Sequence, residues 1–312
     1  MPDDVPVPTP LTLPEGYTQR PLTGADAAAL AATIAASELV DAGEAAIEEA
    51  DLVADWGRPS HDLAADSVAV LHGDAIVAYA EHMGGDRADA TVHPDHRGRG
   101  LGTALAGWLA DRAAELGQDV VGMPVVAGSS GDRLLAELGW EVRWDSWVLA
   151  LPQGTTIPER PLPAGYAIRA ATPAEHRAVW MLNEDTFLEW AQRDRETFED
   201  WQADVVHRPG FEPWQVRVVT DPTGELVAFA VLQVSQDAGG DGYVARLGTR
   251  PDARNRGLAQ ALLVDAFALA RRHGATRSTL ATDSRTGALG LYRKVGMEVI
   301  STWRNRAVRV RG

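Results

Sequence analysis

Two short segments of this chain have the composition of a backbone anion site. Residues 97–102 read Arg-Gly-Arg-Gly-Leu-Gly, and residues 254–259 read Arg-Asn-Arg-Gly-Leu-Ala. Each follows a segment expected to be a strand and precedes a long amphipathic segment expected to be a helix. Glycine and other small residues let a backbone approach its ligand closely, and the N–H groups at a helix N-terminus attract anions. Both segments therefore predict an anion cradle between a strand and a helix.

Other phosphate-binding motifs fit these segments less well. A P-loop needs Gly-Lys-Ser/Thr, which neither segment contains. A dinucleotide fingerprint needs G-x-G-x-x-G after the first strand of a unit and an acid about 20 residues later. Here the motif follows the fourth expected strand, and its spacing is G-x-G-x-G. A glycine turn before a helix is common, but two copies in register strengthen the prediction.

The two segments belong to an internal repeat that spans most of the chain. Arg97 and Arg254 are 157 positions apart (254 − 97), and the same separation recurs downstream. Upstream the separation is 149 positions (166 − 17), as between Tyr17 and Tyr166, so the second copy holds about eight additional residues in its front half. A chain of 312 residues suits two domains of ordinary size.

The repeat and a proline-rich segment predict the domain boundaries. Residues 151–165 contain four prolines, a composition typical of a linker. We therefore expect an N-terminal domain at residues 1–150, a linker at 151–164 and a C-terminal domain at 165–312.

Both copies are expected to contain the same elements in the same order. The fold class that they predict is α/β, with a mixed α+β central sheet flanked by helices. After a short first strand, a helical segment is expected at 24–36 or 173–191. Two strands should follow at 67–71 and 75–80, or at 215–219 and 226–234. The helix after the arginine-glycine segment is expected at 100–116 or 257–273.

These motifs and their order resemble the GNAT N-acetyltransferase superfamily. Its signature, Arg/Gln-x-x-Gly-x-Gly/Ala, binds the pyrophosphate of acetyl-CoA, and the end of the preceding strand pairs with the pantetheine arm. The resemblance covers nearly the whole chain, and the tandem arrangement is similar to mycothiol synthase and related two-domain actinobacterial acetyltransferases. It implies two tandem GNAT-like acyltransferase domains with acetyl-CoA as co-substrate. The implied cofactor-binding residues are Ala90, Thr91, Val92, Arg97, Gly98, Arg99, Gly100, Leu101 and Gly102 in the first copy, and Leu247, Gly248, Thr249, Arg254, Asn255, Arg256, Gly257, Leu258 and Ala259 in the second.

The resemblance also implies a catalytic tyrosine in the second copy. Family members carry a late helix of the form x-G-A-x-x-L-Y-x-K-x-G, and residues 286–297 read TGALGLYRKVGM. In the family this tyrosine lies near the CoA sulfur and can protonate the departing thiolate, which implies Tyr292 as general acid. The matching position of the first copy holds Leu135, which cannot donate a proton. We expect the C-terminal domain to be catalytic and the N-terminal domain to be degenerate.

The resemblance implies that an acid-rich segment at 184–204 borders the acceptor site. It contains eight carboxylates against two arginines, with tryptophans among them. Carboxylates and aromatic faces suit a cationic amine, so Glu189, Trp190 and Trp201 are predicted to bind substrate. A solvated pair of amphipathic helices with tryptophans in the core would explain the same composition. The strand at 243–247 holds no carboxylate, so the sequence does not identify a general base.

Composition narrows the functional classes further. The net charge of −15 opposes binding to nucleic acid or to an anionic membrane surface. The chain has no cysteine, which excludes thiolate chemistry, and no histidine or acid cluster has a persuasive metal-ligand spacing. Residues 1–10 do not resemble a signal peptide, and no apolar run approaches the roughly 18 residues of a membrane span. We expect a cytoplasmic monomer or homodimer without a metal.

The leading hypothesis is an N-acetyltransferase that moves acetyl from acetyl-CoA to a primary amine of a small, cationic substrate by direct attack in a ternary complex. One alternative is a non-catalytic CoA-binding regulatory or scaffold protein, because the first copy lacks the tyrosine and the second lacks a strand carboxylate. Another is a protein or peptide N-acetyltransferase, which would need an open groove.

Overall fold

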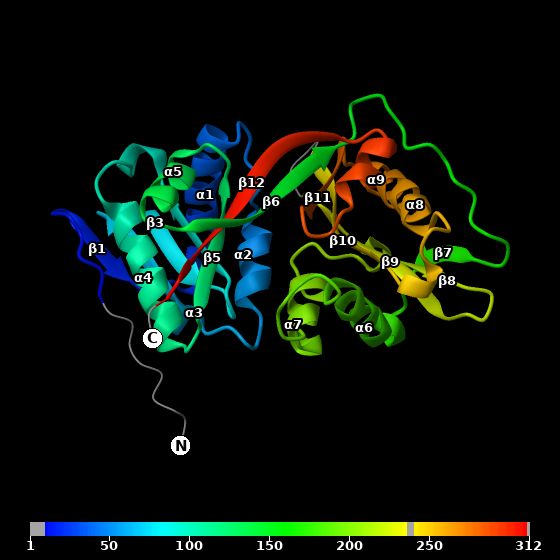
Figure 1. Ribbon diagram of the computed structural model, residues 1–312, viewed down its shortest axis with the longest axis horizontal. Helices are drawn as coiled ribbons and strands as arrows, with labels where there is room; N and C mark the ends of the chain where they lie inside the picture. Colours follow the sequence, from blue (N-terminus) through cyan, green and yellow to red (C-terminus); the bar gives the residue numbers. More distant parts are fainter. Residues whose placement is uncertain (1–9, 236–239, 311–312) are drawn as a thin grey trace, which may run out of the picture. The chain divides into compact units, whose positions relative to one another are not determined.

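The computed structural model describes residues 10–235 and 240–310 of the chain (Figure 1). They form two compact units, one made of Met1–Asp145 and Thr302–Gly312 and the other of Ser146–Ser301. Both units contain helices and strands in the mixed order expected from the repeat, so the predicted α/β class is confirmed.

The first unit contains a four-stranded antiparallel sheet, and its strand β5 belongs to a different sheet. The sheet has the order β1-β2-β3-β4, and β5 pairs with the last strand of the chain, β12, through residues 120–126 and 303–309. The elements are β1 (Tyr17–Arg20), α1 (Ala27–Asp41), α2 (Glu49–Trp56), α3 (Leu63–Asp66), β2 (Ser67–His72), β3 (Ala75–His82), β4 (Ala88–Val92), α4 (Leu101–Glu115), β5 (Val120–Val126), α5 (Ser130–Glu137), the start of β6 (Glu141–Ala150) and most of β12 (Glu298–Arg309).

The second unit repeats this plan. Its strands follow the order β7-β8-β9-β10-β11, and the end of β6 pairs with β11 through residues 146–150. The elements are β7 (Ala167–Ala170), α6 (His176–Phe187), α7 (Phe198–Trp201), β8 (Val216–Thr220), β9 (Leu226–Val234), β10 (Asp241–Thr249), α8 (Leu258–Arg272), β11 (Arg277–Asp283) and α9 (Leu289–Lys294). The expected strand at 226–234 and the expected helix at 257–273 are confirmed, the helix to within one residue at each end.

Helices cover both faces of the sheet in the second unit. Strand β9 is apolar at every position except Gln233, as expected of a strand buried on both sides. Ala230 and Leu232 pack with α8 on one face, whereas Phe229 and Val231 pack with α6 and α7 on the other. Figure 1 shows α8 and α6 on opposite sides of β9 and β10. This packing fixes the strand ends and the start of α8, where the site lies.

No helix among the described residues combines the length and the apolar character needed to cross a membrane.

Candidate active site

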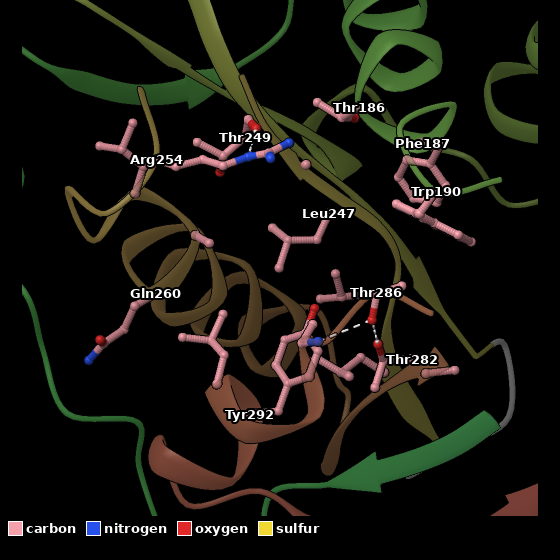
Figure 2. A pocket seen from close by; sticks show the side chains of 18 of the residues that line it. Thr186, Phe187, Trp190, Leu247, Thr249, Arg254, Gln260, Thr282, Thr286 and Tyr292 are labelled. Carbon is pink, nitrogen blue, oxygen red and sulfur yellow. Dashed lines mark hydrogen bonds between the residues drawn. The ribbon is translucent and has the colours of Figure 1, made fainter. Parts of the chain in front are cut away.

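A separation of two parallel strands creates the main cavity of the second unit. Strands β10 and β11 pair only through residues 241–244 and 277–280. Beyond them, the register of β10 against β9 shifts between Val244 and Arg246, so Ala245 lies at a bulge. The cavity that opens there has a volume of about 810 Å³. It is lined by the ends of β10 and β11, the start of α8, the end of α6 and part of α9 (Figure 2).

The start of α8 forms one end of this cavity. Gly257 is the N-cap and has a φ of 82°, a left-handed conformation that glycine adopts without strain. Asn255 is also left-handed, with a φ of 62°. Asn255, Gly257, Leu258 and Ala259 all line the cavity. The first N–H groups of a helix have no partner within the helix, so this end of the cavity has donors for an anion.

The side chain of Arg254 stabilises the loop, and its charge is neutralised by Glu189. Its Nε donates to the carbonyl of Thr249 at 3.0 Å, and its two Nη atoms donate to the Glu189 carboxylate at 2.8 and 2.6 Å. Arg256 does not line the cavity and donates to the Tyr166 hydroxyl and the Asp252 carbonyl. An anion at this loop would therefore bind chiefly to backbone N–H groups.

The end of strand β10 forms the wall of the cavity. Leu247 extends into it between the loop and the far end, as Figure 2 shows, and Gly248 and Thr249 also line it. A Cβ on Gly248 would overlap the Phe229 ring and lie 2.7 Å from Thr186 Oγ1, so close packing requires glycine here. Thr249 Oγ1 is buried and has no hydrogen-bond partner in the described part of the chain, so it is available to a ligand.

Tyr292 lies at the end of the cavity opposite the loop. It belongs to α9, lines the cavity, and is 8% exposed. Burial, with a smaller contribution from Tyr243, raises the pKa of the Tyr292 hydroxyl to about 12. The hydroxyl is therefore protonated at neutral pH and can act as a donor. Figure 2 shows Thr282 and Thr286 beside it, and their hydroxyls are 2.8 Å apart.

Comparison with known proteins agrees with this geometry. The model of the acetyltransferase (GNAT) family matches residues 176–297, and the model of FR47-like proteins matches residues 80–148. A mycothiol acetyltransferase of Salinispora arenicola is 33% identical over 251 residues, which cover 76% of this chain and 78% of that protein. The chain belongs to the GNAT acetyltransferase family. A second mycothiol acetyltransferase, from Thermobispora bispora, is 30% identical over 89% of this chain and 94% of its own length.

Solved structures show the same tandem GNAT fold. A GCN5-related N-acetyltransferase from Sphaerobacter thermophilus aligns with a TM-score of 0.72 and 29% identity, covering 96% of this chain and 98% of the other. A tandem GNAT protein from the clavulanic acid biosynthesis pathway also has a TM-score of 0.72, at 17% identity, and covers 95% of this chain and 99% of its own. The predicted resemblance and fold class are thereby confirmed.

The predicted substrate residues of this GNAT protein lie in different places. Trp190 lines the cavity beside Phe187, with ring centroids 5.4 Å apart, and Figure 2 labels both. The Arg285 guanidinium lies 4.9 Å from the Trp190 ring centroid. Glu189 lines the cavity but holds Arg254. Trp201, the last residue of α7, is fully buried in a core cluster and does not line the cavity.

Arginines neutralise much of the acid-rich segment. Glu184 pairs with Arg193 at 2.7 Å, and Arg246 of β10 contacts both Glu196 and Asp204. The carboxylates that line the cavity are Glu189 and Asp283, and each is paired with an arginine. Among the described residues that line this cavity, no carboxylate is available as a general base without breaking an ion pair.

The first GNAT unit has a smaller cavity at the matching place. It measures about 310 Å³ and is lined by Ala90, Thr91, Val92, Arg97, Gly98, Leu101 and Gly102, whereas Arg99 and Gly100 lie outside it. Arg97 repeats the role of Arg254, since it donates to the carbonyl of Val92 and to both oxygens of Asp41. Leu135 is buried at the place of Tyr292 and also lines the cavity.

The first unit nevertheless has a strand carboxylate that sequence reasoning missed. Asp89 of β4 lines its cavity and accepts a hydrogen bond from the Tyr79 hydroxyl at 2.8 Å. Burial is the main cause that raises the pKa of Asp89 to about 6. The signal was an acid eight positions before Arg97, near the start of the strand that leads to the arginine-glycine segment. A complete site is expected to have a tyrosine as general acid and a strand carboxylate as general base. The second unit has the tyrosine, and the first unit has the carboxylate.

Proposed function

We propose that the protein transfers an acetyl group from acetyl-CoA to a primary amine of a small molecule, in the cavity of the second unit. The observation that carries this proposal is that one cavity joins the glycine-capped start of α8 to the hydroxyl of Tyr292. A phosphate group and a thioester at the two ends of one extended ligand would need this arrangement. The relatives named mycothiol acetyltransferase support a small-molecule acceptor.

In this proposal the backbone of the second unit binds acetyl-CoA. The N–H groups of residues 257–259 hold the pyrophosphate at the start of α8. The pantetheine arm runs along residues 247–249 of β10, where the backbone no longer pairs with β11. Thr249 Oγ1, which is buried without a partner among the described residues, offers a further hydrogen bond to the arm. A backbone N–H near Leu247 polarises the thioester carbonyl.

The chemical step is a direct attack by the amine. The amine nitrogen forms a bond to the thioester carbon, and the bond from that carbon to sulfur breaks. Tyr292 gives its hydroxyl proton to the leaving sulfur, and the proton that leaves the nitrogen restores the hydroxyl, so protons balance. The pKa of about 12 keeps the donor form populated at neutral pH. A primary amine with a depressed pKa, or one that enters uncharged, suits a site without a free carboxylate.

The acceptor is proposed to lie beside Phe187 and Trp190. Both line the cavity at or just after the end of α6, on the side away from Arg254 (Figure 2). Arg285 already occupies a cation–π position over Trp190, and the acids of the segment are largely paired. Attraction of a cationic acceptor is therefore weaker than the composition of the segment suggests. The first unit is proposed to be a degenerate copy, because Leu135 replaces the tyrosine.

A second function keeps support from one observation. The lack of an unpaired carboxylate among the described cavity residues favours a CoA-binding regulatory protein without turnover. The two functions differ in whether any amine releases free CoA.

Isothermal titration calorimetry with acetyl-CoA tests the proposal. Gly257→Glu should lower the affinity at least about 100-fold, because it puts a like charge and a Cβ at a left-handed position where the pyrophosphate would lie. Gly100→Glu is the matched control in the first unit and should leave this binding event intact. A panel of amines, assayed by CoA release, then separates the two functions. Absence of acetyl-CoA binding to the wild type would overturn the proposal.

A further inference from the structure

The segment expected to be only a linker crosses the start of α8. Ile157 is 6% exposed and belongs to the core cluster under this helix. Gln260, in the first turn of α8, donates from Nε2 to the carbonyl of Pro158 at 2.6 Å. Residues 157 and 158 are thus fixed to α8 from two sides, so the chain just after them has a defined position over the loop.

Arg160 follows two residues later and lies on the anion loop. It lines the same cavity as Gly257 and Tyr292. A Cβ added to Gly257 would overlap Cδ and Nε of Arg160, so the arginine lies directly against the N-cap of α8. Its side chain is exposed. The guanidinium is therefore close to the helix N–H groups and can reach a ligand from the solvent side.

Arg160 differs from the other arginines near the loop in having no hydrogen-bond or ion-pair partner in the part of the chain that the structure describes. Arg254 is bound to Glu189, and Arg256 donates to the Tyr166 hydroxyl and a carbonyl. Within residues 10–235 and 240–310, Arg160 makes no ion pair or hydrogen bond. The chain carries 44 acids against 29 lysines and arginines, so an unpaired arginine next to a cavity is notable.

Electrostatics make this position unfavourable unless an anion is bound. The N-terminus of a helix has a partial positive charge, and a cation placed there is repelled by it. A bound phosphate would reverse the sign of this interaction and would give the guanidinium two oxygens in a suitable geometry. The position of Arg160 is explained by a ligand with phosphate charge at the start of α8.

We propose that Arg160 is a phosphate-binding residue of the acyl-CoA site, contributed by the segment between the two repeats. Its guanidinium binds the pyrophosphate from the solvent side, while the N–H groups of residues 257–259 bind it from the helix side. This inference rests on the proposed function. At the upstream repeat spacing of 149 positions (160 − 149), the first unit holds Leu11, so its loop lacks this cation.

Titration of an Arg160→Ala variant with three ligands tests the inference. The ligands are acetyl-CoA, acetyl-dephospho-CoA, which lacks the 3′-phosphate, and S-acetylpantetheine, which also lacks the pyrophosphate. Calorimetry suits the first two, and ligand-observed NMR at millimolar concentration suits the third. We expect Arg160→Ala to lower the affinity for acetyl-CoA and acetyl-dephospho-CoA about tenfold, because an exposed charge-assisted contact to phosphate is lost. The affinity for S-acetylpantetheine should stay unchanged. Arg160→Lys should recover part of the affinity.

Arg272→Ala is the matched control, since Arg272 is an exposed arginine at the opposite end of α8. It removes the same charge and should change none of the affinities. Equal loss for S-acetylpantetheine would show that Arg160 acts through the fold rather than through phosphate. Loss confined to acetyl-CoA would place Arg160 at the 3′-phosphate and overturn the pyrophosphate assignment. Unchanged acetyl-CoA affinity in Arg160→Ala would refute the inference and leave the proposed function intact, whereas a wild type that does not bind acetyl-CoA would refute both.

Discussion

Replacing Tyr292 with phenylalanine removes the hydroxyl and keeps the ring that packs in the core. The structure gives this hydroxyl a pKa of about 12, two above the ordinary value of 10.0, because the residue is buried. A general acid of this type contributes about 100-fold to 10,000-fold to the rate. We place Tyr292→Phe in the lower half of that range, with kcat reduced about 100-fold to 1,000-fold, since a pKa of about 12 makes the phenol a weak acid.

The affinity for acetyl-CoA should hardly change in this variant. The binding contacts that we propose lie at residues 247–249 and 257–259, whereas Tyr292 lies at the other end of the cavity. The assay is CoA release with the best amine from the panel, together with calorimetric titration of acetyl-CoA. The loss should appear in kcat and not in the dissociation constant.

The pH dependence adds a second readout. A raised pKa keeps Tyr292 protonated, so the wild type should not lose activity through this group until the pH approaches 12, well above the 10.0 of an ordinary tyrosine. Tyr243→Phe is the matched control, since Tyr243 lines the same cavity and its charge contributes to the shift. Unchanged kcat in Tyr292→Phe, or a larger loss in Tyr243→Phe, would refute Tyr292 as the proton donor.

Three further substitutions test the packing and the buried charges. Gly248→Ala should destabilise the protein by about 1–3 kcal/mol, because its Cβ would overlap the Phe229 ring. Asp89→Asn should stabilise the first unit by about 1–2 kcal/mol above pH 6, because burial raises the pKa of this carboxyl to about 6 and so disfavours its charged form. The expected gain is kept small because part of the residue faces the cavity. Arg246→Met should cost about 2 kcal/mol, because it leaves two partly buried carboxylates without their cation. Urea unfolding measures all three.

The controls for these variants follow from the same contacts. Gly290→Ala lies on α9, where a new Cβ meets nothing within 4 Å, and it should not destabilise the protein. The pKa of Asp89 is raised in the folded state. The stability that this residue contributes is therefore complete below pH 3.8, the ordinary pKa of an aspartate, and is lost as the pH rises through about 6. The gain from Asp89→Asn should therefore grow between these values and be absent at pH 3. The assigned contacts would be contradicted if Asp89→Asn raised the unfolding free energy equally at pH 3 and pH 8. They would also be contradicted if Gly248→Ala and Gly290→Ala lost equal stability, or if Arg246→Met left the stability unchanged.

The sequence predicted the parts of this fold that depend on local pattern. The expected strand at 226–234 and the helix near 257–273 were visible because apolar runs, glycine turns and helical spacing report local structure. The repeat predicted two copies of one plan, and relatives and solved structures confirm the tandem GNAT fold. Tyr292 and the loop at 254–259 were found as motifs, and the structure brings Tyr292, Arg254, Asn255 and residues 257–259 to one cavity.

Other features depend on contacts that no local pattern reports. Trp201 and Trp190 have similar surroundings in the sequence, but Trp201 lies in the core and Trp190 lines the cavity. The sequence also did not predict which acids pair with arginines, because Arg246 contacts Glu196 and Asp204 from a different element. Arg160 was part of a proline-rich segment that indicated only a boundary. Its position on the loop depends on the burial of Ile157, which composition does not reveal.

The pairing of β5 with β12 also sets the order in which the two units can be completed during synthesis. Residues 120–126 of the first unit pair with residues 303–309, which follow the whole second unit in the sequence. The first unit therefore cannot complete the pairing of β5 until the ribosome has made residues 303–309, although most of its residues emerge earlier. Cutting the chain at residues 151–164 would deprive the first half of its β12 pairing and the second half of residues 146–150. Neither half made separately would contain all of the strands that pair within its unit.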